Sequence, residues 1–73
     1  MSKLPVISGQ QCVKALHKIG FELRSQEGSY IILVQTSTKK RISVLNHKTL
    51  AKGTLRAIIR QAELSIDEFV ALL

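Results

Sequence analysis

Hydrophobic residues in the first part of the chain recur every three or four positions. From Ser8 to Ile19 this spacing places Cys12 and its apolar neighbours on one face of an amphipathic helix. Ser8 followed by Gln11 is the capping-box pattern that begins a helix, and Gly20 is suited to end it in a left-handed turn. The sequence therefore predicts a first helix between Ser8 and Gly20, with Cys12 as a small buried hydrophobe.

The spacing of apolar residues changes to two after this helix. Residues 21–26 and 41–45 alternate between apolar and polar side chains, as half-buried strands do. Between them, residues 30–35 are mostly aromatic or β-branched, with apolar residues on both sides. Turn-forming and polar residues fill 26–29 and 36–40. Three short strands joined by short loops most simply form an antiparallel meander.

A basic loop and a second amphipathic helix occupy residues 46–62. The apolar residues of this helix recur at helical spacing, whereas Arg56 and Arg60 project from its opposite side into solvent. Gly53 and Thr54 supply a flexible entry and a side chain that can cap the helix. The stretch fits two interpretations equally: an anion-binding helix start, or a helix with cationic ends and no ligand.

A short apolar helix ends the sequence. Ser65 and Glu68 repeat the capping box in front of it, and apolar residues continue to Leu73. The order α-β-β-β-α plus a short α predicts an α+β fold, with one three-stranded antiparallel sheet and the helices on one face. With 73 residues, of which 45% are hydrophobic, residues 1–73 are expected to form one small domain.

The middle strand carries more apolar residues than one face of a sheet can bury. If Ile31 and Leu33 face the helices, then Tyr30, Ile32 and Val34 lie on the open face; the opposite phase buries Tyr30 instead. An isoleucine and a valine exposed to water on a sheet are unfavourable unless another surface buries them. We therefore expect a partner surface at Ile32 and Val34, or a terminal segment folded across them.

Positive charge is concentrated in the middle of the chain. The net charge is +6, and residues 28–62 contain no Asp or Glu. A fold that gathers this segment carries a positive field without neutralising acids, for which nucleic acid is the first partner to consider and an acidic protein the second.

No apolar run has the length of a membrane span and no signal-peptide pattern opens the sequence, so we expect a cytoplasmic protein and no membrane partner. The candidate RNA contacts are Lys39, Lys40, Arg41, His47, Lys48, Lys52, Arg56 and Arg60.

The residues also bear on chemistry at a phosphate. RNA can be cleaved without a metal by attack of its own 2′-hydroxyl on the adjacent phosphate. This reaction needs a proton acceptor for the hydroxyl, a proton donor for the leaving oxygen, and cations around the phosphate. The candidate proton-transfer groups are Tyr30 and His47, with His17 a weaker one, and His47 fits a loop hydrogen bond or a phosphate contact as well. Two histidines, one cysteine and scattered acids give no metal-ligand spacing, so neither a metal nor a cofactor is expected.

Three motifs together resemble a known family. Gly28-Ser29-Tyr30 opens the second predicted strand, and Asn46-His47-Lys48 is followed by Lys52-Gly53-Thr54-Leu55-Arg56. With the order of elements, these residues resemble the HicA family of small toxins over nearly the whole chain. The resemblance implies a fold like that of a double-stranded RNA-binding domain, translation-inhibiting cleavage of mRNA, and a HicB-type antitoxin that covers the toxin.

The sequence departs from the family pattern at Tyr30. The family motif at the second strand is Gly-Ser-His, and that histidine is regarded as catalytic. A histidine of ordinary pKa exchanges a proton at neutral pH, whereas a tyrosine with a pKa of about 10 is a poor base. The resemblance therefore places the catalytic position at Tyr30, with a side chain that suits the role poorly.

Three functions stay open on the sequence. The first is an RNA-binding toxin of a type II toxin-antitoxin system, acting as a metal-independent endoribonuclease (mRNA interferase) restrained by a HicB-like antitoxin. The second is an RNA-binding module that does not cleave. The third is a protein-interaction domain that docks an acidic partner on the open face of the sheet.

Overall fold

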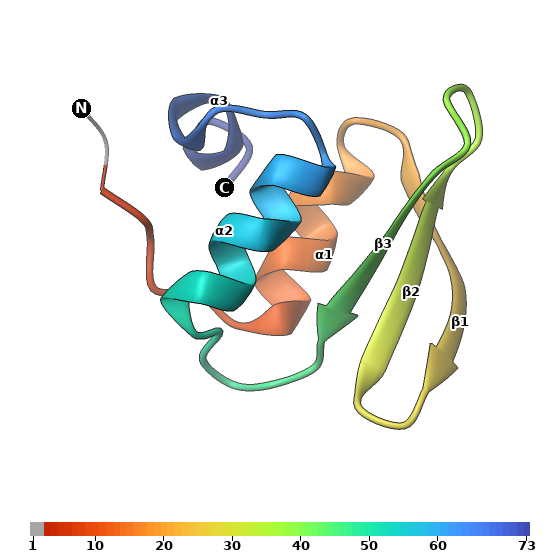
Figure 1. The fold of residues 1–73 in the computed structure, drawn as a ribbon, viewed down its shortest axis with the longest axis horizontal. Helices are drawn as coiled ribbons and strands as arrows, with labels where there is room; N and C mark the ends of the chain where they lie inside the picture. Colours follow the sequence, from red (N-terminus) through yellow and green to blue (C-terminus); the bar gives the residue numbers. More distant parts are fainter. Residues whose placement is uncertain (1–2) are drawn as a thin grey trace.

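Three helices and a three-stranded sheet make up the computed structural model, which describes residues 3–73 (Figure 1). The strands are antiparallel in the order β1-β2-β3, and α1 and α2 pack against the same face of the sheet. This arrangement confirms the predicted α+β fold and its α-β-β-β-α-α order. The elements are α1 (Gly9–His17), β1 (Phe21–Glu27), β2 (Tyr30–Gln35), β3 (Lys40–Leu45), α2 (Lys52–Gln61) and α3 (Ile66–Val70).

Both predicted capping boxes are confirmed. Ser8 Oγ accepts a hydrogen bond from Gln11 N at 3.1 Å, and Gln11 Oε1 accepts one from Ser8 N at 2.9 Å. Ser65 and Glu68 form the same reciprocal pair in front of α3, at 3.1 and 2.9 Å. The chain leaves α1 through Gly20, whose φ of +98° is the predicted left-handed conformation. These local signals determine where α1 and α3 begin and where α1 ends.

The predicted start of α2 was wrong. Gly53 and Thr54 lie inside the helix, and Ala51 is its N-cap in an extended conformation. The position is set by Leu50, which is 5% exposed and donates its backbone N–H to Ile7 O at 2.8 Å. Since Leu50 is held in the core, the chain turns into the helix directly after Ala51. Within the described chain, α2 consequently has no side-chain hydrogen bond at its cap.

The register of the sheet decides which side chains of β2 face the helices. Ile31 pairs with Val44 and Leu33 with Ile42, and all four are at most 5% exposed. Cross-strand partners point to the same face of a sheet, so these residues form the strand side of the core. The first of the two predicted phases is therefore correct, and Tyr30 lies on the open face.

The predicted half-burial of β1 was wrong beyond its first residue. Phe21 is buried, but Leu23 is 64% exposed and the rest of the strand is exposed as well. The register with β2 shifts between Leu23 and Ser25, which marks a β-bulge. β1 is the edge strand farthest from α2 (Figure 1), so the helices cover its beginning but not its length.

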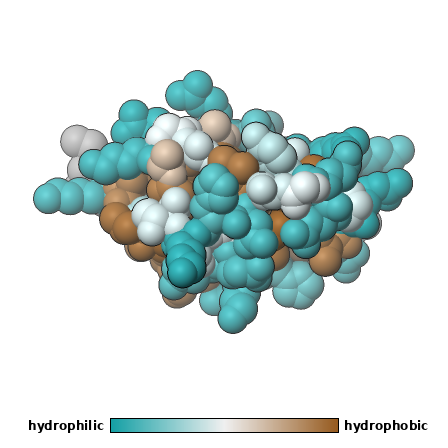
Figure 2. All heavy atoms as spheres, turned by 90° about the horizontal axis from the view of Figure 1, so that it is seen from below, coloured by the Kyte–Doolittle hydropathy of each residue, from teal (hydrophilic) through white to brown (hydrophobic). Residues whose placement is uncertain are grey.

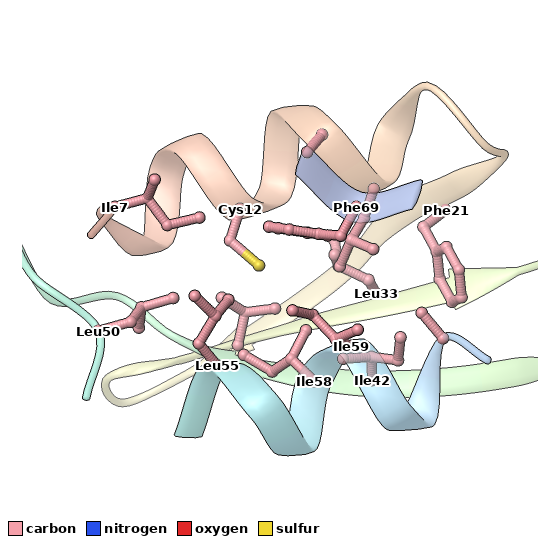
Figure 3. Packing of buried hydrophobic residues seen from close by; sticks show 14 of the residues in the cluster. Ile7, Cys12, Phe21, Leu33, Ile42, Leu50, Leu55, Ile58, Ile59 and Phe69 are labelled. Carbon is pink, nitrogen blue, oxygen red and sulfur yellow. The ribbon is translucent and has the colours of Figure 1, made fainter. Parts of the chain in front are cut away.

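One hydrophobic core joins the helices to the sheet (Figure 3). Cys12 lies within it and is 0% exposed, and burial raises the pKa of its thiol to about 12, which confirms the predicted buried hydrophobe. Phe69 is also 0% exposed and anchors the short α3 in the same core. The largest fully buried side chains are Phe21, Phe69, Leu16, Leu33, Ile42, Leu55, Val44 and Cys12.

Candidate nucleic-acid interface

The loop between β3 and α2, residues 46–51, lies at one end of the molecule (Figure 1). We call the surface formed by this loop, the β1–β2 turn (28–29) and the first residues of α1 and α2 the loop end. Asn46 N donates to Ser29 O at 2.7 Å, and Gln10 Nε2 donates to Asn46 Oδ1 at 3.2 Å. The loop is thereby fastened both to the β1–β2 turn and to α1.

Close packing of the backbone at Gly9, the first residue of α1, also holds this loop in place. Gly9 N donates to His47 O at 2.9 Å. A Cβ atom built on Gly9 would lie 2.1 Å from Leu45 O, a contact that no side chain can accept. Gly9 therefore lets the start of α1 approach the end of β3, and this approach fixes the backbone that carries His47.

Tyr30 and His47 belong to the same end of the fold. Tyr30 is the first residue of β2 and pairs with Leu45, two positions before His47. Tyr30 is 49% exposed and His47 is exposed. The two candidate proton-transfer residues thus lie on segments joined by backbone pairing, although 17 positions separate them in the sequence.

Lys48 and Lys52 add positive charge beside the start of α2. Both are exposed, and Lys52 is the first residue of the helix. The first-turn N–H groups of α2 point out of the helix start, where the described chain offers them no capping side chain. Free N–H donors, the positive end of the helix dipole and two ammonium groups favour an anion such as phosphate. Figure 2 views the loop end directly, and hydrophilic side chains cover much of the visible surface.

Arg56 and Arg60 continue the basic surface along the outside of α2. Both are exposed, while Leu55, Ile58 and Ile59 of the same helix are buried against the core. The amphipathic pattern predicted for this helix is therefore confirmed. The arginines follow Lys52 by one and two helical turns, on the side away from the sheet.

The β2–β3 turn carries the other predicted cations to the opposite end of the sheet. We call this turn, Lys40 and Glu63 the hairpin end. The remaining five residues of β3 separate Lys40 from the β3–α2 loop, about 17 Å of strand. Lys40 forms an ion pair with Glu63, and an Arg41 guanidinium nitrogen lies 3.9 Å from a Glu27 carboxylate oxygen. The expectation of one basic field without neutralising acids is therefore wrong, because the fold brings acids from outside residues 28–62 beside two of the seven bases.

The open face of the sheet buries Ile32 more deeply than the sequence suggested. Ile32 is 4% exposed and Val34 is half-buried, although both lie on the open face. No terminal segment within residues 3–73 folds across them, since α3 and both ends of the described chain lie on the helix side (Figure 1). Ile32 instead lies in a shallow depression that is also lined by Tyr30 of the same strand and by Glu27, Arg41 and Ser43 of the neighbouring strands.

Other candidate chemistry falls outside the loop end. His17 is exposed, and its Nδ1 lies 3.1 Å from Phe21 O, where it ties the end of α1 to β1. In residues 3–73 no three His, Cys, Asp or Glu side chains are grouped so that they could hold a metal ion. In the same residues no helix is long and apolar enough to cross a membrane.

Two parts of this surface escaped the sequence analysis. The uncapped start of α2 was missed because Thr54 looked like the cap; the alanine before Lys52 was the signal that no capping side chain precedes the helix. Glu27 and Ser43 were missed because their place beside Tyr30 and Ile32 depends on strand register.

Comparison with known proteins assigns the chain to a family. No curated protein gives a match. A family model described as HicA toxin of bacterial toxin-antitoxin matches residues 9–64, which run from the first residue of α1 to the segment after α2 and include the whole loop end. The match confirms the resemblance drawn from the sequence motifs, and it implies an antitoxin as partner. The chain therefore belongs to the HicA toxin family, the toxins of bacterial toxin-antitoxin pairs.

Proposed function

We propose that this toxin binds mRNA at its loop end and inhibits translation in the cytoplasm by cleaving it. The observation that supports this proposal most directly is the arrangement of the loop end. An uncapped helix start, Lys48 and Lys52 lie beside the segments that carry Tyr30 and His47. Phosphate binding and proton transfer are the two requirements of metal-independent RNA cleavage, and both groups of residues are present there.

Phosphate binding follows from charge and geometry. The first-turn N–H groups of α2 donate to a phosphate in the place of a side-chain cap, and the two lysines neutralise it. Arg56 and Arg60 extend the contact along the helix to neighbouring phosphates. Each phosphate neutralised adds about 0.7 to the salt dependence of binding to a single strand and about 0.9 for a duplex.

Proton transfer rests on His47 in this chain. Its imidazole is exposed in the loop that precedes α2, and histidine is the side chain that most often serves as a general acid or base at neutral pH. Tyr30 occupies the position of the family's histidine, and its hydroxyl is a weak base at neutral pH. We therefore expect slow cleavage, with Tyr30 orienting the substrate.

Incubation of purified protein with mRNA in excess chelator tests the proposal. Wild type is expected to cleave slowly, His47→Ala to abolish cleavage, and Tyr30→His to raise the rate by about 100-fold, the usual effect of a well-placed general base. His17→Ala is the matched control, because His17 is an exposed histidine at the other end of α1. Failure of the wild-type chain to bind RNA at physiological salt would overturn the proposal.

A second function is favoured by one residue. Because Tyr30 stands where the family pattern has histidine, the chain also fits a toxin relative that binds RNA without cutting it. RNA binding without cleavage by wild type, together with cleavage by Tyr30→His, would establish this alternative.

The antitoxin partner is proposed to be a HicB-like protein of a type II system. An acidic surface on it would cover Lys48, Lys52 and the neighbouring arginines, and so compete with RNA. Copurification of the two proteins, with release of the toxin from RNA, would test this. The third function, a domain that docks an acidic protein on Ile32 and Val34, has less support, because Ile32 is 4% exposed and Val34 is half-buried.

A further inference from the structure

The open face of the sheet contains a shallow depression next to the loop end. Its volume is about 320 Å³, and it is lined by Glu27, Tyr30, Ile32, Arg41 and Ser43. The residues come from all three strands, and the helices lie on the opposite face (Figure 1). The function proposed above makes use of Tyr30 alone among them.

Strand register explains how these side chains meet. Glu27 pairs with Tyr30, and Arg41 pairs with Val34, so the two charged residues stand on either side of β2 and are offset along it. The guanidinium and the carboxylate approach each other diagonally, with 3.9 Å between nitrogen and oxygen. Ile32 lies between Tyr30 and Val34 on the same face, which places it beneath this pair.

The ion pair is weak enough that the Arg41 guanidinium and the Glu27 carboxylate can each bind a ligand instead. A separation of 3.9 Å is too long for a hydrogen bond, and the side chains are 63% and 68% exposed. An exposed pair of this kind contributes only about 0–1 kcal/mol. A ligand that offers a hydrogen-bond acceptor to Arg41 and a donor to Glu27 can therefore enter between them at little cost.

We infer that this depression binds one unpaired nucleobase of RNA and favours guanine, an inference that rests on the proposed RNA binding. The half-exposed ring of Tyr30 offers a stacking surface and Ile32 an apolar floor. Arg41 can donate to guanine O6 and N7, while Glu27 accepts from N1–H and the N2 amino group. A lining of five residues suits one base, whereas a stable protein interface takes about 20–30 residues on each side.

The hydrogen-bonding edges of the bases give an order of preference. Uracil offers one acceptor to Arg41 and one donor, N3–H, to Glu27, so it fits the pair partly. Adenine and cytosine present an unprotonated ring nitrogen at that position of the edge, which faces the Glu27 carboxylate as acceptor against acceptor. We expect guanine to bind more tightly than uracil, and uracil more tightly than adenine or cytosine.

The depression and the loop end act on the same strand of RNA. Tyr30 follows Ser29, whose carbonyl accepts from Asn46 N in the loop that carries Lys48. A strand whose phosphates lie on the loop end therefore passes beside Tyr30, where one unstacked base can turn onto the open face. Recognition of that base supplies the sequence information that phosphate contacts lack.

Binding to short RNAs tests the inference. The probes are fluorescent single-stranded RNAs with one central G, U, A or C in a common context, 2′-O-methylated so that they are not cleaved, and affinity is measured by anisotropy. Wild type is expected to prefer G over A by about five- to tenfold. Glu27→Gln and Arg41→Gln should each reduce this preference to less than about twofold. Tyr30→Ala should lower the affinity for all four probes by about tenfold.

Arg24→Gln is the matched control, because Arg24 is an exposed arginine of the same sheet that does not line the depression. Equal affinity of wild type for all four probes, or a preference unchanged in Glu27→Gln, overturns this inference and leaves RNA binding intact. Loss of antitoxin binding in Glu27→Gln with an unchanged base preference makes the depression a protein contact and also overturns it. Absence of any RNA binding by wild type overturns the proposed function as well. Thermal unfolding of each variant checks that the fold is retained.

Discussion

The loop end and the hairpin end both carry lysines, but the fold places different groups beside those lysines. At the hairpin end, Lys40 is paired with Glu63, which comes from 23 positions further along the chain. At the loop end, Lys48 and Lys52 lie beside a helix start whose N–H groups are not capped by a side chain of the described residues. The proposed anion site therefore lies where no ion pair among the described residues neutralises the lysines and where the helix start adds N–H donors.

The same contrast appears in how each end is built. The hairpin end is a turn of exposed polar residues, in which Lys39 has a φ of +59°. The loop end is fastened by backbone hydrogen bonds: the β3–α2 loop donates to Ser29 O and Ile7 O, and it accepts from Gly9 N. A fixed backbone orients donors before the ligand arrives, which lowers the entropic cost of binding. Four variants test this comparison, in order of expected effect.

The largest effect is expected from Gly9→Ala. The added Cβ would lie 2.1 Å from Leu45 O, so the start of α1 has to move away from β3 and the loop end loses its anchor. We expect a loss of about 3 kcal/mol in the free energy of unfolding, measured by urea denaturation. Gly53→Ala is the control: nothing lies within 4 Å of its Cβ position, and a gain of about 0.5 kcal/mol is expected in the helix. Equal effects of the two substitutions would mean that the close approach at Gly9 is not needed.

The second effect concerns RNA affinity. Lys48→Gln with Lys52→Gln should weaken binding of a single-stranded RNA by about tenfold and lower the salt slope by about 1.4. Lys39→Gln with Lys40→Gln removes the same charge at the hairpin end and should change affinity by less than about twofold, since Lys40 is already paired. Titrations at several salt concentrations measure both. Similar losses from the two double variants would refute the distinction between the ends.

The third effect separates stability from binding. Ala51→Ser supplies the missing cap of α2, because the extended backbone of Ala51 suits an N-cap serine. The free energy of unfolding should rise by about 1 kcal/mol. RNA affinity should fall by a few-fold, since the serine hydroxyl occupies N–H groups that would otherwise donate to phosphate. An increase in both quantities would show that the helix start does not contact the RNA.

The smallest effect is expected from Glu63→Gln. This change frees Lys40 and makes the hairpin end more positive. Stability should change by about 0.5 kcal/mol or less, and RNA affinity should rise by less than about twofold. Anisotropy titration beside wild type measures the affinity. A rise of tenfold would identify the hairpin end as an RNA contact that Glu63 suppresses.

Much of the fold was predictable because its signals are local. The capping boxes at Ser8 and Ser65, the left-handed Gly20 and the apolar run of β2 each act within a few residues of themselves. Errors arose where a distant contact decided the outcome. Leu50 fixed the start of α2 through Ile7, and the position of β1 at the edge of the sheet left Leu23 exposed.

The candidate site was predictable in its residues and not in its arrangement. Tyr30, His47, Lys48 and Lys52 were identified from motif and charge, and the fold brings their segments to one end. Lys39 and Lys40 carry the same chemistry in the sequence but lie about 17 Å of strand away from the loop. Linear proximity in a charged segment therefore says little about proximity in the fold.

The amino-acid sequence by itself determined the order of the elements, the burial of Cys12 and the excess of positive charge, because periodicity, capping and composition act along the chain. Only the tertiary structure decided which cations are neutralised and why Ile32 is covered on an open face. Both outcomes depend on side chains that meet across strands or from opposite ends of the chain, as Glu63 meets Lys40 and Glu27 approaches Arg41. Such meetings are set by register and packing, which no local pattern specifies.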